Sequence, residues 1–218
     1  MIKAAHLYAD LMNLYGDTGN MKALACHLRE AGIELSVDHL SLGDSIRFED
    51  YDFLYIGSGT EQNLLLALDD LLSHREELTA YHQNGGMLLA TGNSMELFGK
   101  QITVGETVRE ALGIADFTVT YGSRVVRDVC VPCKLTEQEL IGFENHSGTV
   151  SADGSILVNG NFYLTYIIGP LLVRNPQFTD YLIRQLAERT GETITAKPDH
   201  TLEQKAYEVF RASMKQPE

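Results

Sequence analysis

Short apolar runs alternate with longer amphipathic stretches over the first hundred residues. The apolar runs predict buried strands at residues 2–8, 33–40, 52–56 and 87–91. Between them, residues 21–30 predict a helix that stops at Gly32, and residues 63–84 predict two helices broken near Ser73. This order, with glycines after the strands, is typical of an open parallel sheet whose ligands bind at one edge.

The pattern changes after residue 116. Residues 117–121 and 125–131 predict two antiparallel strands joined by a turn at Gly122-Ser123. Further strands are expected at 155–158 and 162–168, followed by a helix at 176–189 and an amphipathic stretch at 202–214. We therefore predict an α/β fold, a mostly parallel open sheet with an antiparallel extension. We expect one domain over 1–195 and a helical tail over 196–218, packed on that domain or on a partner.

Composition and charge argue against several classes of protein. The formal net charge is −13, which argues against binding nucleic acid through its phosphates. The three cysteines are too few for a disulfide framework and fit a reducing compartment. The sequence starts without a signal-like apolar segment, and the run 167–173 is far too short to span a membrane. We expect a cytoplasmic protein.

Three blocks of the sequence carry a family resemblance. The first spans residues 6–20, the second Gly142-Phe143-Glu144-Asn145-His146, and the third Gly169-Pro170-Leu171-Leu172 with Asn175-Pro176. Their order resembles class I glutamine amidotransferases of the cobyric-acid-synthase type, and most closely the glutaminase subunit of lipid II isoglutaminyl synthase. The family-motif positions are Tyr8, Asp10, Asn13, Tyr15, Gly16, Asp17, Gly19, Asn20, Glu144, Asn145 and His146. Taken singly, these residues also suit turns and caps.

The resemblance implies a flavodoxin-like sheet and a specific chemistry. A cysteine after a strand attacks the glutamine carboxamide, a histidine handles the proton, and backbone N–H groups hold the oxyanion. The ammonia passes to a partner synthetase that resembles Mur ligases and serves peptidoglycan amidation. No cofactor is implied.

The residues that carry this chemistry are replaced here. Gly92 stands at the position of the nucleophile, and Ile168 stands where the family has its histidine. The oxyanion loop corresponds to Gly57-Ser58-Gly59, where a backbone N–H is still offered. Loss of both nucleophile and base leaves only residual binding effects. We therefore expect an inactive amidotransferase-like partner of a Mur-ligase-like enzyme.

Two alternatives remain open. Ser94 could replace the nucleophile with His146 as the nearest candidate base, although a helix N-cap at Asn93 or Ser94 is the more natural interpretation. A flavodoxin-like module could instead hold a glutamine-like ligand near Glu96, Arg124 and the loop Gly57-Ser58-Gly59.

We expect no metal site. A single pair, Cys130 and Cys133, is weak evidence for zinc, and with Cys26 these are more simply small buried residues. The remaining histidines outside the blocks lie among polar residues without ligand spacing: His27, His39, His74, His82 and His200.

Overall fold

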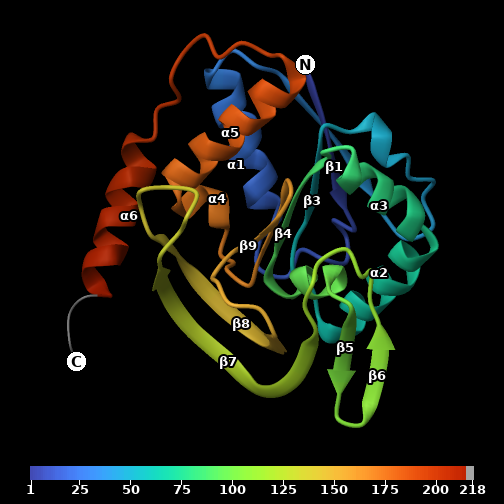
Figure 1. Ribbon diagram of the computed structural model, residues 1–218. Coiled ribbons are helices and arrows are strands. Elements are labelled where there is room, and N and C mark those ends of the chain that lie inside the picture. Colours follow the sequence, from blue (N-terminus) through green and yellow to red (C-terminus); the bar gives the residue numbers. More distant parts are fainter. Residues whose placement is uncertain (215–218) are drawn as a thin grey trace.

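The computed structural model describes residues 1–214, and its centre is a six-stranded sheet (Figure 1). The strands are β1 (Ile2–Leu7), β2 (Leu35–Leu40), β3 (Phe53–Ile56), β4 (Met87–Thr91), β9 (Leu157–Asn159) and β10 (Phe162–Thr165). They lie in the order β2-β1-β3-β4-β10-β9, and every neighbouring pair is parallel except β10 with β9. The prediction of a mostly parallel α/β sheet is confirmed.

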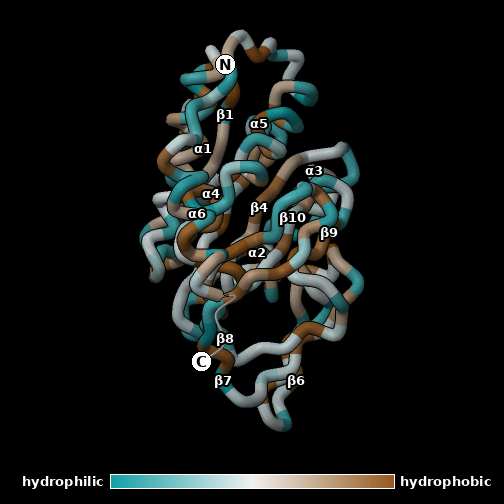
Figure 2. Tube along the Cα trace, turned by 90° about the vertical axis from the view of Figure 1, so that its left-hand side faces the viewer, coloured by the Kyte–Doolittle hydropathy of each residue, from teal (hydrophilic) through white to brown (hydrophobic). Residues whose placement is uncertain are grey.

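Helices cover both faces of this sheet. One face carries α1 (Thr18–Glu30), α4 (Leu171–Arg174) and α5 (Pro176–Thr190), and the other carries α2 (Glu61–Ser73) and α3 (Arg75–Gln83). The strands β3, β4 and β10 are buried at every position because helices cover both faces of the sheet there. In β3, Phe53 and Tyr55 pack towards α1, whereas Leu54 and Ile56 pack towards α2. Figure 2 shows β4 as an apolar stretch inside the molecule, with hydrophilic segments outside it.

The cap of helix α1 does not come from the residue at its N-cap position. Asp17 occupies that position but makes no side-chain cap bond. The Thr18 backbone N–H instead donates to Oδ1 of Asn13 at 2.9 Å. The Asp17 side chain instead makes its hydrogen bonds with Tyr15 and Ser58.

A second sheet lies below the first in Figure 1. Its strands are β5 (Gln101–Val104), β6 (Thr107–Glu110), β7 (Val119–Val131) and β8 (Leu140–Val150), in the order β6-β5-β7-β8. The predicted hairpin at Gly122-Ser123 is wrong. These residues lie within the single strand β7, where the register against β8 shifts between Tyr121 and Val125. Gly122 lies at an irregularity inside a strand. The local sequence does not distinguish a glycine in this position from a glycine in a turn.

The C-terminal helix α6 (Thr201–Ser213) packs beside β8 and α4. Its Tyr207 hydroxyl donates to the Glu139 carbonyl at 3.0 Å, and Arg211 Nε donates to Oε2 of the same residue at 2.8 Å. The last part of the predicted tail, residues 215–218, lies outside the described residues. Among residues 1–214, every helix is too short or too polar to cross a bilayer.

Candidate functional site

The centre of the candidate site is a sharp turn at Gly92, which we call the elbow. Strand β4 ends at Thr91, and the 3₁₀ helix η2 (Gly92–Phe98) begins immediately after it. Gly92 has φ of +69°, in the left-handed region that glycine enters without steric cost. A strand that turns this tightly into a helix is the backbone geometry that presents a nucleophile in hydrolases.

The space that a nucleophile would occupy is filled. A Cβ atom built on Gly92 would collide with the Ser58 side chain and would lie 2.9 Å from Cγ2 of Ile168. Ile168 is 1% exposed, and two backbone hydrogen bonds with Phe143 of β8, of 2.9 and 3.2 Å, hold it in place. Gly92 and Ile168, which the family resemblance gives the positions of nucleophile and base, are therefore neighbours, and the side chains of Ile168 and Ser58 fill the space beside Gly92.

The loop that would hold an oxyanion is also occupied. The Asn93 side chain accepts from the Gly59 N–H at 3.0 Å and donates to the Gly59 carbonyl at 2.8 Å. The Ser58 N–H is engaged as well, since it hydrogen-bonds to Asp17. Oxyanion stabilisation requires N–H groups that point at empty space for the substrate oxygen. Here the amides of Ser58 and Gly59 already have partners within the chain.

Asp17 lies under this loop as a buried carboxyl. Its Oδ2 accepts from the Tyr15 N–H at 3.1 Å and from the Ser58 hydroxyl at 3.3 Å. Burial raises the pKa of Asp17, while these hydrogen bonds partly offset the shift. A Cβ on Gly57 would overlap Asp17, so the loop approaches Asp17 closely because Gly57 has no side chain.

Ser94 lies inside η2, and its hydroxyl is hydrogen-bonded to the backbone. It is fully buried, and its Oγ lies 3.1 Å from the Ile56 carbonyl and 2.9 Å from the Thr91 carbonyl. The expected N-cap at Asn93 or Ser94 is wrong, because η2 begins earlier, with Thr91 at its N-cap position. Asn93 serves the Gly59 loop, and Ser94 ties η2 to the ends of β3 and β4.

Glu96, on η2, is buried against the second sheet. Its Oε2 accepts from the Tyr121 hydroxyl of β7 at 2.8 Å. Burial raises the pKa of the Glu96 carboxyl to about 7, and the hydrogen bond from Tyr121 only partly opposes this shift. Gly148 of β8 packs so close that a Cβ there would overlap Oε1 of Glu96. Glu96 is fully buried and so is not exposed to a ligand from solvent.

His146 belongs to a neighbouring polar group on β8. Its ring stacks on Tyr166 with centroids 3.7 Å apart, and its Nδ1 lies 2.7 Å from the Gly148 carbonyl. Glu144 faces it at 4.0 Å and also pairs with Arg127 at 2.8 Å. Hydrogen bonds from His146 and Arg127 hold the pKa of Glu144 below its usual value despite burial.

The three sequence blocks meet around the elbow. Asn145 of the second block donates to the Tyr15 hydroxyl at 2.6 Å and accepts from Nε of Arg124 at 2.8 Å. Asn20 accepts from the Leu172 N–H at 2.8 Å, which joins the first block to the third. Gly19 packs against Pro170 so closely that a Cβ there would lie 2.7 Å from its Cγ. The blocks therefore build one connected framework, as their joint order indicated.

The remaining motif positions are structural supports at the rim. Tyr8 follows β1 with φ of +53°, and its hydroxyl donates to Asp70 at 2.8 Å. Asp10 is exposed and accepts from Ser41 at 2.7 Å. Gly16 turns the chain with φ of +74° in open space, which leads into α1.

Two further sequence expectations need correction. Cys26, Cys130 and Cys133 are half-buried rather than buried. His27 is buried, and it lies with His200 and Glu203 in one group whose ligand atoms are all within 4.8 Å of one another. The expectation that the remaining histidines lie among polar surface residues is therefore wrong for His27.

Comparison with known proteins shows which proteins this chain is similar to. Residues 3–163 match the CobB/CobQ-like glutamine amidotransferase domain. The chain is 30% identical over 206 residues to the lipid II isoglutaminyl synthase (glutamine-hydrolyzing) subunit GatD of Staphylococcus aureus, covering 85% of this chain and 84% of that one. It is also 30% identical over 217 residues to the same subunit of Streptococcus pneumoniae, covering 88% and 84%.

Solved structures share the fold at low identity. PurLQS from Thermotoga maritima aligns with a TM-score of 0.55 and 11% identity, over 87% of this chain and 99% of that one. A crystal structure of a glutamine amidotransferase aligns with a TM-score of 0.51 and 18% identity, over 86% and 98%. The family match over residues 3–163 and the 30% identity to the two GatD subunits show that this chain belongs to the CobB/CobQ-like glutamine amidotransferase family.

Proposed function

We propose that this protein is a non-catalytic member of the family, which acts in the cytoplasm as the partner or regulatory subunit of a Mur-ligase-like synthetase in peptidoglycan amidation. One observation carries the proposal: the space between Gly92 and Ile168, where the relatives' chemistry is expected, is packed shut.

Three separate parts of the glutaminase reaction lack a group to perform them. Glycine at position 92 has no atom that attacks a carboxamide, and Ile168 exchanges no proton. The Gly59 N–H, which would stabilise an oxyanion, is held by Asn93 at 3.0 Å. Since the loss of the nucleophile or the base alone lowers the rate by orders of magnitude, we expect no glutamine hydrolysis at an ordinary enzymatic rate.

The partnership with a synthetase is supported by the relatives. Both curated relatives are subunits of lipid II isoglutaminyl synthase, and this chain covers 84% of each. The framework around the elbow is kept by specific contacts, such as Asn145 with Tyr15 and Asn20 with Leu172. We infer that the chain, which keeps this framework without the reacting groups, also keeps the relatives' role as a subunit.

The alternative of a Ser94 nucleophile is disfavoured by the position of its hydroxyl. Ser94 is fully buried, and its Oγ lies within hydrogen-bond distance of two backbone carbonyls rather than beside a basic nitrogen. A glutamine-like ligand is disfavoured for a related reason, since Glu96 is buried and the amides of Ser58 and Gly59 are engaged. Arg124, which is exposed beside Asn145, is the one predicted ligand residue with an accessible charge.

The test is glutamine hydrolysis and complex formation with purified proteins. Ammonia release is measured for this chain alone and with the Mur-ligase-like protein of the same cell, with Ser94→Ala as the paired variant. We expect no release from either protein, and co-elution with the synthetase in size-exclusion chromatography. Release that disappears in Ser94→Ala would establish the alternative nucleophile, whereas failure to co-elute at micromolar concentration would contradict the partnership.

A further inference from the structure

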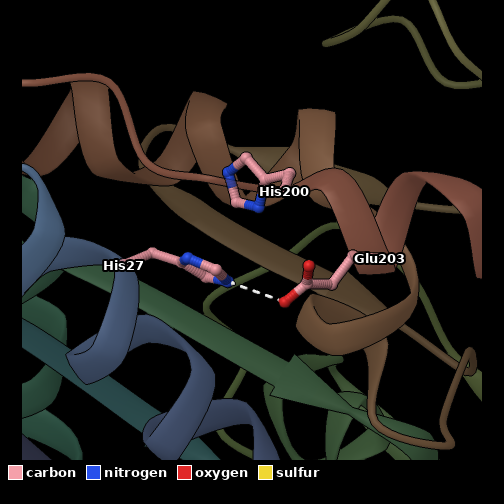
Figure 3. A group of neighbouring side chains, drawn as sticks. All are labelled: His27, His200 and Glu203. Atoms are coloured by element: carbon pink, nitrogen blue, oxygen red, sulfur yellow. Dashed lines mark ion pairs between the residues drawn. The ribbon is translucent and has the colours of Figure 1, made fainter.

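A second polar cluster lies away from the elbow, between α1 and the start of α6. Figure 3 shows His27 of α1 facing Glu203 of α6, with the His200 ring beside them. His27 Nε2 lies 3.3 Å from Oε1 of Glu203, and the two imidazole rings have centroids 4.2 Å apart. Two imidazoles and one carboxylate thus converge from segments at opposite ends of the sequence.

Each histidine of this cluster has a carboxylate on its other side. Nδ1 of His27 lies 3.0 Å from Oε2 of Glu30, and Nε2 of His200 lies 2.8 Å from Oδ1 of Asp180. A carboxylate in this place accepts the N–H of one ring nitrogen and leaves the lone pair of the other nitrogen for a metal. Histidines that bind zinc are almost always oriented by such partners.

The free nitrogen of His200 is an independent observation. With Nε2 committed to Asp180, the other ring nitrogen, Nδ1, is buried and has no hydrogen-bond partner among the described residues. The His200 side chain is only 10% exposed. A buried polar nitrogen without a partner costs free energy, so its retention calls for a ligand that accepts its lone pair.

We propose that His27 Nε2, His200 Nδ1 and a Glu203 carboxylate oxygen form a binding site for one Zn²⁺ ion. One ligand atom from each residue lies within 4.8 Å of the others, and the 3.3 Å between His27 and Glu203 already matches the spacing of about 3.3 Å around a tetrahedral zinc ion. Two histidines and one glutamate are a donor set that zinc accepts, with water in the fourth position. That position opens to a surface hollow of about 590 Å³ that His27, Glu203 and Cys26 help to line.

The bound ion would fix α6 to the body of the domain. Glu203 and His200 stand at the start of α6, whereas His27 is near the end of α1, which packs on the central sheet. Zinc coordination contributes free energy to whatever arrangement brings its ligands together. The site thus holds the position of the C-terminal helix, independently of the closed elbow.

The test uses the full, untagged chain, stripped with a chelator and titrated with Zn²⁺ in competition with a chromophoric zinc indicator. We expect one Zn²⁺ per chain, and an affinity at least about tenfold lower in His200→Gln and in Glu203→Gln, since each removes one ligand. His74→Gln is the matched control, because His74 makes the same i,i+3 contact with Glu77 at 3.0 Å but lies outside the cluster. That variant should bind zinc like the wild type.

Hydrogen exchange supplies a second measurement that does not depend on affinity. Zinc should slow amide exchange in residues 201–213 of the wild type and have no such effect in Glu203→Gln, whose fold is checked by circular dichroism. The proposal is overturned if the wild type takes up no zinc, or if both ligand variants bind it as tightly as the wild type.

Discussion

At the residue scale, Gly92 meets two requirements that can be measured separately: a left-handed backbone conformation and a lack of space for a side chain. Its φ of +69° disfavours any residue with a Cβ, and the neighbouring Ser58 and Ile168 leave no room for one. Gly113 has the same φ of +69°, but a Cβ on Gly113 would have no atom within 4 Å, so this position isolates the backbone effect.

Gly92→Ala should therefore be more destabilising than Gly113→Ala. Both variants carry a left-handed penalty of about 1–2 kcal/mol, and Gly92→Ala adds overpacking of about 1–3 kcal/mol. Urea denaturation of the two variants and the wild type measures the difference. Equal losses in the two variants would show that the elbow has space for a side chain, which would weaken the case for a closed site.

At the element scale, the sequence predicts the sheet better than its extension. Strand β4 and the helix break near Ser73 are found as expected, because buried apolar runs and local breakers mark them directly. The error at Gly122-Ser123 has a different cause. Whether a glycine turns a chain or forms a bulge depends on the partner strand, and β8, which pairs there, has no clear alternating pattern.

In the candidate site, too, some features could be predicted from the sequence and others could not. That Gly92 and Ile168 would be neighbours is implied by the family resemblance, which gives them the positions of nucleophile and base. That Asn93 would bond both polar atoms of the Gly59 backbone does not, because it depends on the exact approach of two loops. The group of His27, His200 and Glu203 is harder still to predict from the sequence. These residues come together only because the start of α6 lies near α1 in the fold.

Glu96 connects two elements, η2 and β7, through its hydrogen bond with Tyr121. Because burial raises its pKa in the folded state to about 7, the folded protein keeps a proton at pH values where the unfolded chain has already released it. The stability contributed by this proton is present below the unfolded pKa of about 4.5 and is lost as the pH rises through 7.

Glu96→Gln should remove this loss of stability towards neutral pH. In the wild type, the free energy of unfolding should fall by roughly 2–3 kcal/mol between about pH 5 and pH 8 on account of Glu96, and in the variant that fall should be absent. Urea titrations of both proteins at several pH values give the slopes. Parallel pH profiles would mean that Glu96 is already ionised in the folded state at neutral pH.

At the scale of the whole molecule, a second buried group acts in the opposite direction. His6 of β1 is fully buried between His39 and Tyr55, and both ring nitrogens are without hydrogen-bond partners among the described residues. Burial lowers the pKa of His6 to about 4. Its unfolded pKa is about 6.5, so the unfolded chain binds the additional proton as the pH falls. Stability due to His6 is therefore present above about 6.5 and is lost towards about 4.

His6→Leu should remove the acid loss that is due to His6. The wild type should lose about 2 kcal/mol between about pH 7 and pH 5 through His6, and the variant should not. His39→Gln serves as the control, because His39 is the smaller of the two causes of the shift and its removal should leave most of the loss in place. An acid loss of equal size in His6→Leu would assign it to other groups. Because the His6 loss towards acid and the Glu96 loss towards neutral pH fall in overlapping pH ranges and have opposite signs, the two largely cancel in the wild type. Each single variant should therefore show the slope of the remaining group, and the double variant His6→Leu/Glu96→Gln should return to a profile close to that of the wild type.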